Sequence, residues 1–132
     1  MNESYLDQPE PKINTEDPLW PQVIDDVTNI AFPKDLAQEI AKDMQERHEV
    51  GVKRYGTALQ PYNGRNPVVD AYQEVLDSIV YLKQALIEER GMLGDDQDGI
   101  EYLYKQSIQT AMALRYLLNE GTIELNTDNW KK

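Results

Sequence analysis

Three carboxylates in the run DAYQEVLD have a spacing that could hold a divalent cation. Asp70, Glu74 and Asp77 fall within about 60° of one another on a helix that turns about 100° per residue. None of the three has a Lys or Arg four residues later, although such pairs stabilise exposed helices. Because Mg²⁺ binds carboxylates, waters and substrate phosphates, the pattern indicates a metal site that handles phosphate.

A second acidic group precedes the first by about thirty residues. Glu39, Asp43 and Glu46 repeat the i, i+4, i+7 spacing, and Glu49 extends that side by one turn. If the two helices pack antiparallel, we expect the two groups to converge, and they would repel each other without a cation. The alternative is that each group forms an ordinary solvated helix face.

A di-iron bundle is excluded by the histidine count. Such bundles carry a Glu-x-x-His motif on two helices. This chain has one histidine, His48, and Gln45 stands three residues before it. We interpret His48 as a surface or packing residue.

Basic and aromatic residues near the acidic groups are candidates for substrate binding. Lys53 and Arg65 flank the loop between the two acidic helices, and Arg65 could bind phosphate oxygens bidentately. Asn63 is placed to contact a sugar or phosphate, and Trp20 could stack on a base. Lys83 lies off the acidic face and is a weaker candidate. Charge balance, turn formation and packing are the alternative roles of these residues.

The hydrophobic spacing predicts helices and no strand long enough for a sheet. The fold class is therefore all-α, a bundle of about four to five helices. Asn66 is predicted to cap one helix, Gly51 to end another, and Asp98 with Glu101 to cap the last. The predicted helices span 21–32, 33–50, 67–90 and 100–120, and a short extended piece is predicted at 122–125. We expect an N-terminal arm (1–18), one helical domain (19–121) and a C-terminal tail (122–132).

The composition argues against several classes of protein, including nucleic-acid-binding and membrane-spanning proteins. A formal net charge of -11 opposes binding to nucleic-acid phosphates. The sequence has no long apolar run, which argues against a membrane span, and the N-terminus lacks the pattern of a signal peptide. Cysteine is absent, so disulfides and thiolate metal sites are excluded. We expect a cytoplasmic protein, in the host cytoplasm if the chain is phage-encoded.

Two short motifs resemble the signature of a known enzyme superfamily. Glu46-x-x-Glu49 and Glu74-x-x-Asp77 occur in the order found in the all-α nucleoside triphosphate pyrophosphohydrolases, the MazG-like superfamily. The run from Glu46 to Thr57, the Asn63-Gly64-Arg65 turn and the stretch 70–82 are similar to its phage-type members. The resemblance covers roughly residues 33 to 90.

The resemblance implies an activity and a metal site. Members bind Mg²⁺ or Mn²⁺, cleave the bond between the α and β phosphates, and form dimers or tetramers. By this resemblance Glu46, Glu49, Glu74 and Asp77 hold the metal, and Glu46, Glu74 and Asp77 are the catalytic residues. Asp43 lies closer to the centre of the acidic face than Glu49 does, which makes it a candidate for a further ligand. Similarity to phage members that act on guanine nucleotides makes dGTP or GTP the expected substrate. The alternatives are an acidic interaction protein and a nucleotide-binding protein without turnover.

Overall fold

The computed structural model describes residues 8–88 and 95–120. Within these ranges the chain forms four helices and no strand, which confirms the all-α class. They are α1 (Leu19–Ile30), α2 (Lys34–Tyr55), α3 (Pro67–Glu88) and α4 (Asp95–Asn119). None of these helices has the length and apolar character needed to cross a bilayer. The predicted extended piece at 122–125 lies outside the described residues.

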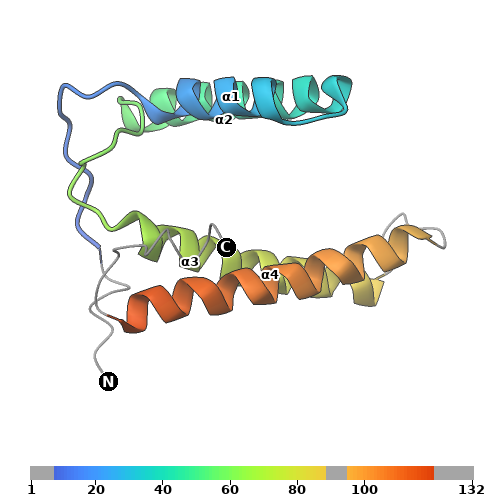
Figure 1. Ribbon diagram of the computed structural model, residues 1–132. Coiled ribbons are helices and arrows are strands. Elements are labelled where there is room, and N and C mark those ends of the chain that lie inside the picture. The colour runs from blue at the N-terminus through green and yellow to red at the C-terminus, as the bar shows by residue number, and fades with distance from the viewer. Residues whose placement is uncertain (1–7, 89–94, 121–132) are drawn as a thin grey trace. The chain divides into compact units, whose positions relative to one another are not determined.

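The chain divides into two compact units, each built on one pair of helices. The first unit is Pro9–Arg65 and contains α1 packed on α2. The second contains Gln8 and the chain from Asn66 onward, with α3 packed along α4 (Figure 1). The boundary at residues 65 and 66 falls inside the span 19–121 that we expected to form one domain.

The prediction for the end of α2 is wrong by five residues. The helix continues through Gly51 to Tyr55 and ends at Gly56, which has a φ of 76°. The N–H of Gly56 donates to the carbonyl of Val52 at 2.8 Å, as expected of a left-handed C-terminal cap. Lys53 and Arg54 lie in the last turn, where positive charge interacts favourably with the helix dipole. Gly51 costs helix stability but does not require a stop.

The start of α3 confirms the predicted cap, whereas the start of α4 does not. Asn66 Oδ1 accepts a hydrogen bond from the N–H of Val68 at 2.9 Å, and Pro67 occupies the first helical position. Helix α4 begins at Asp95, so Asp98 lies inside the helix and does not cap it. Gln97 Nε2 donates to the carbonyl of Leu86 at 3.2 Å. This contact with α3 stabilises the first turn of α4, which begins five residues before the predicted start of the helix at residue 100.

Replacing Asn66 with alanine should remove this cap and destabilise the fold by about 1 kcal/mol. The backbone of Asn66 also bonds to Gln8, and the substitution leaves those groups in place. Urea unfolding of Asn66→Ala and Asn66→Asp would measure the effect, because aspartate keeps the oxygen acceptor. Equal destabilisation by both variants would contradict a capping role.

Each unit buries few side chains completely. Among the described residues the buried hydrophobic ones are Ala37 in the first unit and Val69 and Ala111 in the second. On α3, Val68 is half-buried, and its neighbour Val69 is more enclosed, at 2% exposure. Val80 is 64% exposed and Ile87 72% exposed. Thus neither helix pair covers all of its own apolar surface.

Candidate functional site

In the first unit, the Pro-rich segment before α1 is hydrogen-bonded to the loop after α2. The N–H of Lys12 donates to the carbonyl of Asn63 at 2.8 Å, and the N–H of Leu19 donates to the carbonyl of Leu59 at 2.9 Å. Asn14 and Gln60 bond reciprocally: Asn14 N–H donates to Gln60 Oε1, and Gln60 Nε2 donates to the carbonyl of Asn14. Residues 9–18 of the expected N-terminal arm, together with the loop after α2, therefore form one hydrogen-bonded layer in this unit.

The turn after Tyr62 fixes the direction of Arg65. Asn63 Oδ1 accepts from the N–H of Arg65 at 3.1 Å, and Gly64 has a φ of 88°, which a side chain would oppose. The Arg65 guanidinium donates from Nη1 to the carbonyl of Pro9 at 2.7 Å. The loop thus holds Arg65 against the N-terminal segment.

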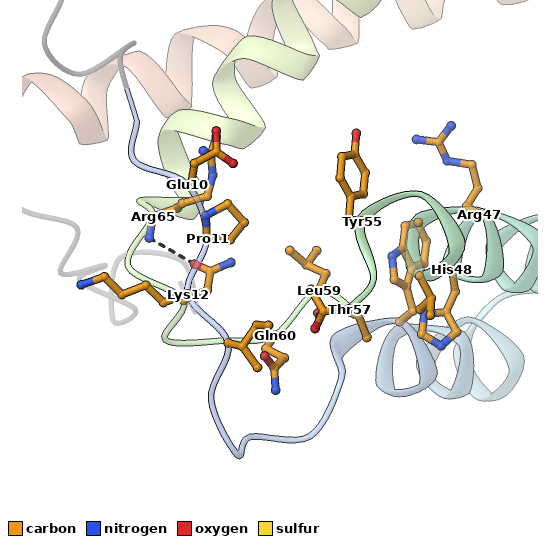
Figure 2. A pocket seen from close by; sticks show the side chains of 16 residues that line it. Glu10, Pro11, Lys12, Arg47, His48, Tyr55, Thr57, Leu59, Gln60 and Arg65 are labelled. Carbon is orange, nitrogen blue, oxygen red and sulfur yellow. Dashed lines mark hydrogen bonds between the residues drawn. The ribbon is translucent and has the colours of Figure 1, made fainter.

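A pocket of about 580 Å³ lies between this layer and the C-terminal half of α2. Figure 2 shows His48 and Tyr55, which project from α2, across the pocket from Glu10 and Arg65. Its volume lies within the range typical of small-molecule sites. The lining residues are Glu10, Pro11, Lys12, Ile13, Trp20, Arg47, His48, Gly51, Val52, Tyr55, Thr57, Ala58, Leu59, Gln60, Asn63 and Arg65.

The charge of the pocket lining is opposite to that of the chain. Three basic residues, Lys12, Arg47 and Arg65, line it, against one carboxylate, Glu10. The whole chain has 13 basic and 24 acidic residues. Trp20 and Tyr55 add aromatic surface. The lining therefore suits an anion that also carries a ring.

His48 has a buried ring nitrogen without a partner. Its Nδ1 is enclosed and makes no hydrogen bond within the described part of the chain. An unsatisfied buried polar atom costs about 1–3 kcal/mol, and because Nδ1 is fully enclosed, a molecule in the pocket cannot reach it unless the ring moves. From the sequence we expected His48 to be a surface or packing residue. The available signal was its spacing from Gly51 and Tyr55, which places all three on one face of a helix.

The acidic face of α2 points away from this pocket. Asp43, Glu46 and Glu49 are exposed, and none of them lines the pocket. At about 100° per residue, His48 and Tyr55 lie roughly 180–200° around the helix from Glu46. Lys53, also exposed, lies within about 40° of both Glu46 and Glu49. Lys53 is thus the predicted phosphate contact that shares a face with these carboxylates.

In the second unit, Glu74 and Asp77 form an exposed i, i+3 pair on α3. Asp70 differs from them, because it is half-buried and its Oδ1 accepts a hydrogen bond from Gln8 Nε2 at 2.8 Å. Lys83 lies roughly 180° around α3 from Glu74. Its ammonium group stands 5.3 Å from the centre of the Tyr104 ring, at a shallow apolar groove that includes Ile79, Val80 and Ile87.

The two carboxylate pairs have the donor chemistry that Mg²⁺ and Mn²⁺ accept. Glu46, Glu49, Glu74 and Asp77 make no ion pair or hydrogen bond through their carboxylates within the described residues. Inside neither unit do three or more described acidic or histidine side chains gather into a group that could hold a metal. Each pair therefore fits as part of a site, because Mg²⁺ often takes only one or two carboxylates beside waters and phosphates.

The structure brings together three of the five residues predicted to contact substrate. Trp20, Asn63 and Arg65 line the pocket, whereas Lys53 lies on the acidic face of α2 and Lys83 on α3. Comparisons with protein-family models, with curated proteins and with solved structures gave no match.

Proposed function

We propose that the protein is a metal-dependent nucleoside triphosphate pyrophosphohydrolase. The proposal rests on the resemblance to the MazG-like superfamily and on one observation that agrees with it. Two exposed carboxylate pairs, Glu46 with Glu49 and Glu74 with Asp77, have no cationic partner among the described residues. Unneutralised pairs of this kind are suited to binding a divalent cation.

The proposed reaction is attack of water on the α phosphorus, with pyrophosphate as leaving group. Bound Mg²⁺ or Mn²⁺ supplies charge neutralisation and Lewis-acid activation at the phosphates. By the resemblance, Glu46, Glu49, Glu74 and Asp77 would hold the cation, and Lys53 would contact phosphate oxygens from the acidic side of α2. A carboxylate accepts the proton of the attacking water. Asp43, which is exposed on the same side of α2, suits this role or that of a further ligand, whereas Asp70 already bonds to Gln8.

The proposed substrate is dGTP or GTP. Among phage enzymes of the superfamily, the sequence resembles MazZ, the (d)GTP diphosphohydrolase of phages that replace adenine with 2-aminoadenine. This choice of base rests on the resemblance alone. We still predict that the substrate contacts Trp20, Asn63, Arg65 and Lys83.

Product analysis with each common NTP and dNTP tests the proposed reaction. We expect a nucleoside monophosphate and pyrophosphate, in equal amounts, with Mg²⁺ or Mn²⁺ and none after chelation. The highest turnover is expected with dGTP or GTP. Release of single phosphates would contradict cleavage at the α–β bond, and a folded sample without turnover would contradict the enzyme itself.

A nucleotide-binding protein without turnover is the second candidate. It is favoured by the pocket of the first unit, which combines basic and aromatic residues and lacks the proposed metal ligands. Saturable nucleotide binding without any product, in the presence of either metal, would support it.

We also propose that the chain forms a homodimer or homotetramer. Large apolar side chains stay exposed on α4, including Tyr102, Met112 and Tyr116, and exposed apolar surface of this kind favours association. Light scattering after size exclusion should give a mass two or four times the chain's 15.2 kDa. A monomeric mass at micromolar concentration would contradict the proposal.

A further inference from the structure

We propose that the turn Asn63-Gly64 is a site of self-modification, at which Asn63 loses its side-chain amide and becomes aspartate or isoaspartate. The Gly64 nitrogen attacks Asn63 Cγ and forms a C–N bond, and its proton goes to the side-chain nitrogen, which leaves as ammonia. Water then cleaves one of the two C–N bonds of the cyclic imide and leaves a carboxylate. The reaction needs only water, so this inference does not rest on the proposed hydrolysis.

Three asparagines among the described residues make the same local hydrogen bond, which allows a direct comparison. The Oδ1 atoms of Asn14, Asn63 and Asn66 each accept from the N–H two residues later, at 2.8, 3.1 and 2.9 Å. In each turn a donor therefore meets the oxygen that becomes negative when Cγ is attacked. Donors in that position stabilise the developing charge. The following residue and the departing amide then decide which asparagine reacts.

The surroundings of Asn14 and Asn66 oppose the reaction. Pro67 has no N–H and cannot supply the attacking nitrogen to Asn66. Thr15 follows Asn14, and its β-branched side chain crowds its own nitrogen. The Nδ2 of Asn14 also donates to two carbonyls of the loop after α2, at 2.9 and 3.1 Å, and these bonds hold the group that must leave.

Neither obstacle is present at Asn63. Gly64 is exposed and has no side chain, and its N–H makes no hydrogen bond within the described part of the chain. The Nδ2 of Asn63 likewise has no hydrogen-bond partner among residues 8–88 and 95–120, so the amide is free to leave. The turn itself favours glycine, because φ at Gly64 is 88°. The same backbone that directs Arg65 therefore leaves a reactive nitrogen beside Asn63.

The product changes both the charge and the hydrogen bonds of this unit. Either product adds a carboxylate to a pocket lining that carries an excess of basic residues. Isoaspartate also lengthens the main chain by one methylene. It converts the Asn63 carbonyl, which accepts from the N–H of Lys12 at 2.8 Å, into a free carboxylate. We therefore expect the isoaspartate form to unfold at a lower urea concentration than the unmodified protein.

Peptide mapping of the incubated full chain tests the proposal. The folded protein is held at neutral pH and physiological temperature, and each asparagine-containing peptide is quantified by mass spectrometry over time. We expect the Asn63 peptide to gain one mass unit and to separate into aspartate and isoaspartate forms. Conversion at Asn63 should be about tenfold faster than at Asn14 or more. An unchanged Asn63 peptide, or equal conversion at Asn14, would overturn the proposal.

Two comparisons separate the native turn from the dipeptide sequence alone. Protein unfolded in guanidinium chloride keeps Asn63-Gly64 but loses the turn, so conversion should be at least as fast in the folded protein. Gly64→Ala adds a Cβ that meets only the aliphatic chain of Lys12, at 3.7 Å or more, and should slow conversion about tenfold. Gly99→Ala, which adds the same methyl to open space on α4, is the matched control. Faster conversion in the unfolded chain, or an equal rate in Gly64→Ala, would refute a reaction promoted by this turn.

Discussion

Glu74→Gln is expected to lower the rate of pyrophosphate release by about 100-fold or more while the helix content stays unchanged. Removing one group that organises charge at a reacting centre typically costs 10²–10³ in rate, roughly. Glutamine has the shape of glutamate but no negative charge, so it is a much poorer ligand for Mg²⁺. Asp77→Asn should act in the same way, because the resemblance gives both residues to one half of the metal site.

The fold should survive these substitutions. Glu74 is exposed and makes no polar contact through its carboxylate within the described residues. Like charges on one helix face repel by a few tenths of a kcal/mol, so Glu74→Gln in metal-free buffer should be as stable as the wild type or slightly more stable. Loss of activity could not then be attributed to unfolding.

Asp98→Asn is the matched control for this measurement. Asp98 lies on α4 in the same unit, is exposed, and loses the same single charge. Full activity of Asp98→Asn beside an inactive Glu74→Gln would assign the loss to the site. Equal losses in both variants would point to overall charge, and an active Glu74→Gln would remove this carboxylate from the proposed mechanism.

The helices could be predicted from sequence because their apolar residues recur with helical spacing, but two of their ends were predicted wrongly. Gly51 suggested an end and Asp98 a cap, and both residues lie inside helices. The stop at Gly56 is a matter of backbone conformation, since its φ of 76° is a position that favours glycine. The early turn of α4 depends on a contact between Gln97 and Leu86, which no local pattern reports.

The carboxylate pairs and the pocket differ in how far sequence could predict them. The two members of each pair lie three residues apart on one helix, so spacing alone places them on one face of that helix. The pocket instead combines α2 with a segment and a loop that have no periodicity. Reciprocal bonds between Asn14 and Gln60 hold these together, 46 residues apart in the chain. Trp20, Asn63 and Arg65 were selected by residue type. Arg47 and His48 were not selected, because the helix was predicted to end at residue 50 and therefore did not carry Gly51 and Tyr55 beside them.

Adding Mg²⁺ or Mn²⁺ should raise the stability of the wild-type protein, and chelation should reverse the gain. A cation that binds only the folded state stabilises it by about 2.7 kcal/mol at a hundredfold excess over its Kd. That energy corresponds to several degrees in Tm for a chain of this size. Thermal unfolding with and without EDTA would measure the shift.

The carboxylate variants separate specific binding from general screening. Any salt reduces repulsion in a chain of net charge -11, so NaCl at matched ionic strength provides the baseline. The order of stabilities should then invert: Glu46→Gln and Glu74→Gln would match or exceed the wild type in EDTA and fall below it in Mg²⁺. A shift that NaCl reproduces, or one that both variants retain in full, would mean that these carboxylates form solvated faces and that the cation acts elsewhere.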